Sequence, residues 1–148
     1  MKHLRPYQQQ ANDAIAAAYA SALRKLVLQL PTGGGKTITA SALIDRYLKS
    51  MHGKKVLFVV HREELLTQFR SAIYGQYGII AEPIVAGVKY RNPSSQVYVT
   101  MVETANNRLR KTARWFGDVG MVIIDECHIG SFAKLHEYFA DALIVGLS

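Results

Sequence analysis

The sequence predicts an α/β fold, a doubly wound and largely parallel sheet with helices on both faces. Short apolar runs alternate with longer helical runs along all 148 residues. The run Val56–Val60 is continuously apolar, which is typical of a strand covered on both faces. Prolines and glycines fall mostly between these runs, and no linker separates them. We therefore expect one domain over residues 1–148, long enough to bury one core.

The first half of the chain contains three helical runs. Pro6 can open an Ala-rich helix that runs to about Leu23. Two further helices are expected at Lys36–Leu48 and Glu63–Tyr74, the second broken by Gly75 and Gly78.

Helices and strands also alternate in the second half, and Pro83 interrupts a short strand there. Helices are expected at Val102–Lys111 and Phe132–Ala140. The expected strands of the whole chain are Lys25–Leu30, Val56–Val60, Ile79–Val85, Gln96–Thr100, Gly120–Ile124 and Leu143–Leu147.

Composition narrows the classes of protein. Hydrophobic residues make up 49% and charged residues 20%, as in a globular domain rather than a disordered chain. No apolar run approaches the roughly 18 residues of a membrane helix, and the N-terminus does not look like a signal peptide. A single cysteine excludes an internal disulfide framework and suits a cytoplasmic location.

The net charge of +7 favours a polyanionic partner. Nucleic acid is preferred over an anionic membrane, because no amphipathic basic helix is evident. The alternative is that this charge serves only solubility.

A glycine-rich turn, Leu30-Pro-Thr-Gly-Gly-Gly-Lys-Thr37, lies between a predicted strand and a predicted helix. Its three glycines, Gly33–Gly35, allow backbone N–H groups to surround phosphate oxygens, and the helix N-terminus adds positive potential. Lys36 can reach the β and γ phosphates of a nucleotide, and Thr37 can offer its hydroxyl to Mg²⁺. The general motif has glycine where this chain has Leu30, so a glycine-rich turn with a chance lysine is the alternative.

A second motif, Ile123-Ile-Asp-Glu-Cys-His128, ends an apolar run in two carboxylates. Asp125 is suited to hold Mg²⁺ directly or through water, and Glu126 to deprotonate an attacking water. Cys127 and His128 lack the four-ligand spacing of a structural zinc site. Together the two motifs predict nucleotide binding and hydrolysis.

With both motifs in place, the chain resembles the first RecA-like domain of superfamily 2 helicases and translocases of the DEAD/DEAH branch. Four stretches occur in the order of that family: Leu4–Gln9, Pro31–Thr37, His61–Leu65 and Asp125–His128. The pattern is most similar to RadD-like and restriction-enzyme-like DNA helicases. DEAD-box RNA helicases usually read Pro-Thr-Arg-Glu-Leu in the third stretch, and Ala-Asp where this chain has Cys127-His128.

The resemblance implies that ATP and Mg²⁺ bind at the two motifs. It also implies that Gln8 recognises the adenine edge and that Arg5 or Tyr7 packs on the base; a polar first helical turn is the alternative. Further nucleotide contacts are implied for Pro31, Thr32, Gly33, Gly34, Gly35, Lys36, Thr37 and His128.

Nucleic-acid contacts are implied for four residues: His61, Arg62, Gly87 and Thr100. The alternative at His61–Gln68 is a helix start whose glutamates complement the helix dipole. The family often has glutamine two residues after the threonine, where this chain has Val102.

The last strand, followed by Ser148, is similar to the stretch that leads into the family's Ser/Thr-Ala-Thr motif. We therefore expect a second RecA-like lobe, with an arginine finger and half of the nucleic-acid track, to lie beyond this sequence.

A basic stretch near the second motif contains aromatic residues: Arg108, Arg110, Lys111, Arg114, Trp115 and Phe116. It allows either a stacking nucleic-acid contact or a solvated helix face with the aromatics packed under the sheet. The second is favoured, because charge runs are usually solvated.

The leading hypothesis is the ATP-binding lobe of a DNA helicase or translocase, with RNA less favoured as the track. A non-catalytic nucleotide-binding or interaction module is the main alternative. A P-loop ATPase or kinase unrelated to nucleic acid leaves the first and third stretches of the resemblance unexplained.

Overall fold

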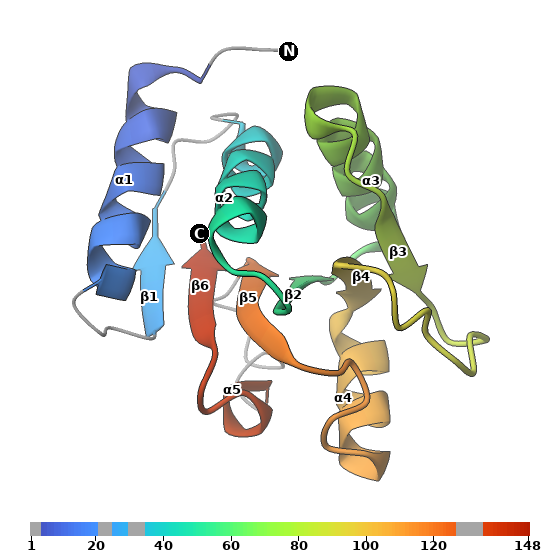
Figure 1. The fold of residues 1–148 in the computed structure, drawn as a ribbon. Coiled ribbons are helices and arrows are strands. Elements are labelled where there is room, and N and C mark those ends of the chain that lie inside the picture. Colours follow the sequence, from blue (N-terminus) through green and yellow to red (C-terminus); the bar gives the residue numbers. More distant parts are fainter. Residues whose placement is uncertain (1–3, 21–24, 30–34, 127–134) are drawn as a thin grey trace.

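In the computed structural model of the protein, the described residues are 4–20, 25–29, 35–126 and 135–148. Five helices and six strands lie along them, and they alternate except for two consecutive strands (Figure 1). The helices are α1 (Pro6–Ala20), α2 (Lys36–Ser50), α3 (Glu63–Tyr77), α4 (Val102–Lys111) and α5 (Leu135–Tyr138). The strands are β1 (Lys25–Leu28), β2 (Lys55–Val60), β3 (Ala81–Ile84), β4 (Val97–Met101), β5 (Val119–Asp125) and β6 (Leu143–Leu147).

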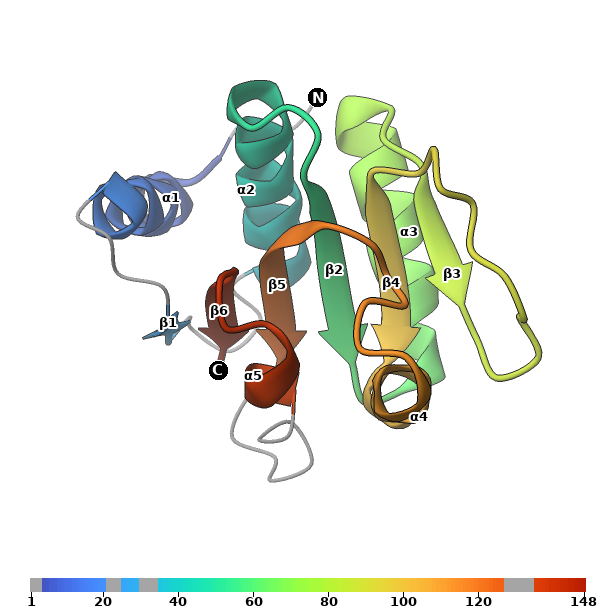
Figure 2. The same cartoon turned by 60° about the horizontal axis from the view of Figure 1, so that its bottom comes forward.

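The six strands form one sheet in the order β1-β6-β5-β2-β4-β3, and every pairing is parallel. All carboxyl ends therefore meet at one edge of the sheet, which Figure 2 shows at the arrowheads. Strand β6 lies between β1 and β5, so it separates the strand before the glycine-rich turn from the strand that ends in Asp125.

Two layers of helices cover the sheet (Figure 2). One buried cluster joins α1, α2 and α3 to one face, and a second joins α4 and α5 to the other. Strand β2 alternates between them: Phe58 packs in the first cluster, whereas Leu57 and Val59 pack in the second. A strand covered on both faces must be apolar throughout, which explains the continuous run at Val56–Val60.

The predicted doubly wound parallel fold is confirmed, with two local corrections. Helix α3 does not break at Gly75 but continues to Tyr77 and ends at Gly78, whose φ of +67° is the left-handed conformation of a helix C-cap. Pro83 does not interrupt β3: that strand is at the edge of the sheet, where one side of the backbone has no partner strand and proline is tolerated. Part of the predicted helix Phe132–Ala140 lies outside the described residues.

No helix in the described ranges is both long enough and apolar enough to cross a membrane.

Candidate functional site

The carboxyl edge of the sheet brings the two predicted motifs together. Gly35 and Lys36 begin α2, which follows β1, and Asp125 is the last residue of β5. Lys36 Nζ lies 3.1 Å from Glu126 Oε1, a contact between residues 90 positions apart in the sequence. In open α/β sheets, ligands bind at this edge of the sheet.

Gly35 starts α2 in a conformation that favours glycine. Its φ is +72°, and no side chain caps the N-terminus of the helix. Its carbonyl oxygen accepts hydrogen bonds from the Thr39 N–H at 2.9 Å and the Thr39 hydroxyl at 3.2 Å. The first turn also contains no acidic residue, so the positive end of the helix dipole stays available for an anion.

The ion pair between Lys36 and Glu126 is accessible to solvent. The two side chains are 26% and 31% exposed, so the attraction is screened and adds little to the stability of the fold. An anion that binds Lys36 more strongly can therefore replace Glu126 at small cost. The pair holds the predicted phosphate ligand against the predicted general base.

Asp125 is a buried carboxylate, only 8% exposed. Burial raises its pKa above the ordinary value; Lys36 and His61 act in the opposite direction, and the charge of Glu126 adds to the increase. Its Oδ1 accepts a hydrogen bond from the Glu126 N–H at 3.1 Å. A nearby cation would stabilise the ionised form of this buried carboxylate, so Asp125 is suited to bind a metal ion.

Glu126 has a φ of 55°, which is unusual for a residue other than glycine. Such backbone strain concentrates at functional sites, where the surrounding fold holds a side chain in a required direction. Here it turns the chain just past β5 and places the Glu126 carboxylate against Lys36.

The N-terminus of α1 is tied to the glycine-rich turn through Gln8, which is 3% exposed. Its amide NH₂ donates to the Gly35 carbonyl at 3.3 Å, and its amide oxygen accepts from the Arg5 N–H at 2.8 Å. Arg5 is exposed and Tyr7 is half-buried. Gln8 therefore lies beside the nucleotide motif, although its contact with adenine stays a prediction.

The residues predicted to contact nucleic acid lie at the same edge but differ in accessibility. Arg62 is exposed as the N-cap of α3, and Gly87 is exposed in the loop after β3. His61 is half-buried, and its Nδ1 has no hydrogen-bond partner among the described residues. Thr100 is 0% exposed and its hydroxyl donates to the Ile84 carbonyl at 2.8 Å, so its position does not favour the predicted contact.

Some predicted site residues lie outside the described residues: Pro31, Thr32, Gly33, Gly34 and His128. Thr37 is described and half-buried in the first turn of α2, where its carbonyl accepts from the Ser41 hydroxyl at 2.7 Å. The hydrogen bonds from Thr39 to the Gly35 carbonyl were not predicted. The signal was a threonine four residues after a turn glycine, a spacing at which a hydroxyl can bond back to the carbonyl.

The donor set fits Mg²⁺ bound together with a nucleotide. Among the described residues, no three His, Cys, Asp or Glu side chains form a metal cluster. Mg²⁺ is usually held by one or two carboxylates completed by phosphate oxygens and water, rather than by a cage of protein ligands. Asp125 and the Thr37 hydroxyl are oxygen donors of the kind that such a site uses.

Fold and site together define a P-loop nucleotide-binding lobe of the RecA-like type. Over residues 1–148 the chain matches the family described as type III restriction enzyme, res subunit, and it belongs to that family. The expected resemblance to a superfamily 2 helicase lobe is thereby confirmed.

Individual relatives agree with this assignment. The chain is 30% identical to the endonuclease subunit of the type I restriction enzyme EcoAI from Escherichia coli, with 99% of the chain and 19% of that protein covered. It is 36% identical to a Saccharomyces cerevisiae protein provisionally named ATP-dependent helicase IRC3, with 92% of the chain and 21% of that protein covered. The chain thus spans about a fifth of the length of these relatives.

A solved structure supports the fold. The crystal structure of UvsW from bacteriophage T4 superposes with a TM-score of 0.79 at 22% identity, covering 99% of this chain and 30% of the other. At this identity the likeness concerns the fold.

Proposed function

We propose that the chain is the ATP-binding lobe of a DNA helicase or translocase that couples ATP hydrolysis to movement on nucleic acid. One observation carries the proposal. The Lys36 ammonium and the carboxyl groups of Asp125 and Glu126, from distant parts of the sequence, meet at the positive end of α2.

The chemistry follows from this arrangement. Lys36 is the cation for the β and γ phosphates of ATP, and the N-terminus of α2 supports the same negative charge. When Lys36 turns to phosphate, its ion pair with Glu126 opens, and the Glu126 carboxylate can accept a proton from the attacking water. Asp125 and Thr37 would hold Mg²⁺, which supplies neutralisation of phosphate charge.

The choice of DNA as the track rests on relatives. A restriction endonuclease subunit, a DNA helicase from bacteriophage T4 and the archaeal DNA helicase Hel308 are all similar to this chain. The net charge of +7 agrees with a polyanionic partner. RNA is the second candidate, because a mimivirus relative at 29% identity is named as an RNA helicase.

We also propose that full activity needs a second RecA-like lobe. The resemblance implies that this lobe closes over the nucleotide and contributes an arginine, which in P-loop enzymes accelerates hydrolysis by roughly 10³ to 10⁵. A cytoplasmic location is proposed from the single cysteine alone.

Steady-state ATP turnover tests the proposal. The chain alone should hydrolyse ATP slowly, and Glu126→Gln should abolish that turnover while nucleotide binding remains, because the amide keeps the shape but cannot accept the proton. Undiminished turnover in Glu126→Gln would show that the base lies elsewhere. Fast hydrolysis by the monomeric chain, stimulated by single-stranded DNA, would contradict the requirement for a second lobe.

A further inference from the structure

The loop between β3 and β4, residues 85–96, is held in place along most of its length by side-chain hydrogen bonds. The Arg108 guanidinium of α4 donates to the Ala86 carbonyl at 3.1 Å and also to the carbonyls of Val85 and Val88. The same guanidinium lies over the Trp115 ring, with its central carbon 5.2 Å from the ring centroid. The start of the loop is therefore fixed to α4.

The second half of the loop is fixed to β4 and β2. Arg91 donates to the Trp115 carbonyl at 2.8 Å and to the Tyr98 hydroxyl at 3.1 Å. The Tyr98 hydroxyl donates in turn to the Asn92 carbonyl at 2.5 Å. Lys55 Nζ donates to the carbonyls of Pro93 and Ser95, both at 2.6 Å. The loop is thus ordered before any partner binds.

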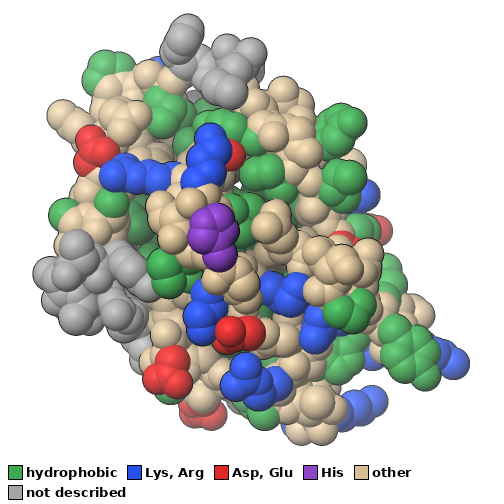
Figure 3. All heavy atoms as spheres, viewed as in Figure 1, with side chains coloured by type: hydrophobic (Ala, Val, Ile, Leu, Met, Phe, Trp, Pro, Cys, Tyr) green, Lys and Arg blue, Asp and Glu red, His purple; other side chains and the backbone are tan. Residues whose placement is uncertain are grey.

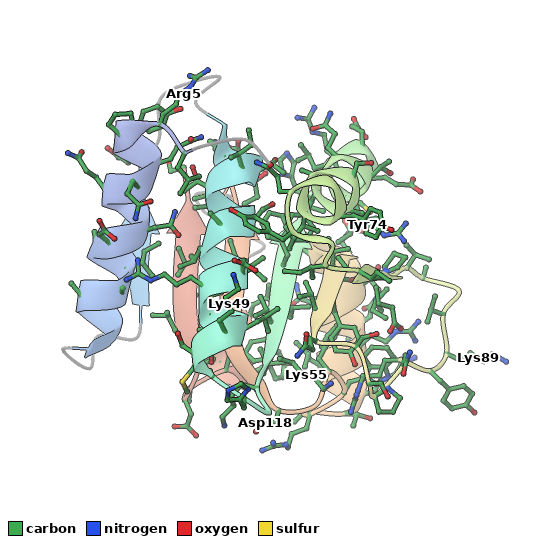
Figure 4. The ribbon with its side chains drawn as sticks, turned by 45° about the horizontal axis from the view of Figure 1, so that its top comes forward. Arg5, Lys49, Lys55, Tyr74, Lys89 and Asp118 are labelled. Atoms are coloured by element: carbon green, nitrogen blue, oxygen red, sulfur yellow. The ribbon has the colours of Figure 1, made fainter. Side chains whose placement is uncertain are left out.

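Lys89 and Tyr90 lie between these two fixed halves, and we call them the loop tip. Val88 on one side packs against the core and Arg91 on the other is anchored, while both tip residues are exposed. Tyr90 is 85% exposed, the most of any large hydrophobic side chain among the described residues. Figure 4 shows Lys89 pointing away from the body of the protein.

The position and charge of the tip fit a nucleic-acid strand. The loop leaves the carboxyl edge of the sheet, where Arg62 and the nucleotide motifs also lie. Basic side chains gather over α4 and this loop, at the lower right of the face in Figure 3. The last turn of α4 contains three basic residues, Arg108, Arg110 and Lys111.

Gly87, for which the resemblance implies a nucleic-acid contact, lies in the same loop. A Cβ built at Gly87 meets nothing within 4 Å, and its φ is not in the left-handed region. The fold therefore does not need glycine at this exposed position, three residues before Tyr90. A ligand backbone that approaches closely would need it.

We propose that the loop tip is a preorganised contact for single-stranded nucleic acid, in which the Tyr90 ring stacks on a base and Lys89 pairs with a phosphate. This proposal rests on the proposed function and adds two contact residues, Lys89 and Tyr90, to those that the family resemblance implies. Rigid anchoring lowers the entropy lost when the strand binds, and stacking on an aromatic ring tolerates any base. Arg108 acts as a positioning residue, because it holds the loop without reaching the tip.

Anisotropy of a fluorescein-labelled oligothymidine binding to the 148-residue chain tests the proposal. Tyr90→Ala should raise the Kd about 5- to 150-fold, the range expected for loss of one stacked base, and Tyr90→Phe should keep the parental value. Tyr74→Ala is the matched control, because Tyr74 is also an exposed tyrosine, 62% exposed, but lies on α3. Gly87→Ala should weaken binding without lowering the melting temperature.

The salt dependence of oligothymidine binding measures the contribution of Lys89 separately from that of Tyr90. Lys89→Gln should reduce the slope of log K against log salt by about 0.7, the contribution of one phosphate contact on a single strand. Lys49→Gln, at an exposed lysine of α2, should leave the slope unchanged.

The outcomes separate this inference from the proposed function. If the parent binds the oligonucleotide and Tyr90→Ala binds equally well, the tip is not a nucleic-acid contact and a protein partner becomes the explanation for the exposed ring. If Tyr90→Phe loses as much affinity as Tyr90→Ala, the hydroxyl rather than stacking is responsible. Absence of any binding by the parent would overturn both this inference and the nucleic-acid part of the proposed function.

Discussion

Replacing Gly35 with alanine tests how the glycine-rich turn is joined to the N-terminal helix. Gly35 has a φ of +72°, and a Cβ at this position would lie 2.6 Å from Gln8 Nε2. The substitution therefore has two destabilising effects. It strains the backbone, and it creates a clash that moves the Gln8 amide away from the Gly35 carbonyl.

The size of each effect follows from the geometry. A left-handed conformation destabilises the folded state by roughly 1–2 kcal/mol when the residue has a Cβ. Alanine also lowers the entropy of the unfolded chain, which offsets about 0.4–1 kcal/mol of that loss. Loss of the Gln8 hydrogen bond adds about 0.5–1.5 kcal/mol. Gly35→Ala should thus reduce the free energy of unfolding by about 2 kcal/mol.

Gly78→Ala is the matched control for the backbone strain. Gly78 also has a left-handed φ, +67°, but a Cβ there meets nothing within 4 Å. Its substitution should cost only the backbone part, about 1 kcal/mol. The difference between the two variants isolates the contact with Gln8.

Urea unfolding followed by circular dichroism measures both variants. Gly35→Ala should lose about 1 kcal/mol more than Gly78→Ala, and in the Gln8→Ala background this excess should disappear, because the clashing amide is gone. Equal losses in the two glycine variants, or an excess that survives in the Gln8→Ala background, would refute the proposed link between α1 and the turn.

Two further substitutions test the fold and the acidic motif. Gly75→Ala, within α3 and with nothing within 4 Å of its added Cβ, should stabilise the protein by about 1 kcal/mol and raise Tm by roughly 2–4 °C; an unchanged or lower Tm would contradict the uninterrupted helix. Because burial raises the pKa of Asp125, the folded state binds its proton more tightly, and stability falls as pH rises from the ordinary value of 3.8 through the higher folded pKa. Asp125→Asn removes the cost of burying the charged carboxylate, so in urea unfolding the variant should be more stable than the parent at pH 7. This difference should shrink as the pH falls through the folded pKa toward 3.8. A variant less stable than the parent at pH 7 would show that contacts of the carboxylate outweigh the cost of its burial.

Much of the fold could be predicted from the sequence because its elements carry local signals. The run at Val56–Val60 is apolar at every position, which only a strand covered on both faces requires. The errors arose where the surroundings outweigh a local preference. Gly75 weakens an isolated helix, but the packing of Phe69 and Ile73 keeps α3 continuous past it.

The site could be predicted where its residues stand in contiguous sequence motifs. Lys36, Asp125 and Glu126 stand in such motifs, and the structure brings them together. The role of Arg108 was not predictable, because its partners are backbone carbonyls of a loop about twenty residues earlier in the chain. Among the aromatics of that basic stretch, Phe116 is buried and Trp115 packs against it, as the favoured interpretation expected.

Calorimetric titration of Mg²⁺-ATP into the parent chain and Lys36→Ala tests the central claim, that this lobe binds nucleotide through the lysine after the glycine-rich turn. The parent should bind, and Lys36→Ala should lose detectable binding while its circular dichroism spectrum stays unchanged, because among the described residues the side chain makes only a solvent-accessible ion pair. Lys49→Ala, at an exposed lysine of the same helix that also pairs with a carboxylate, should bind like the parent. Equal affinity of Lys36→Ala and the parent would contradict the claim.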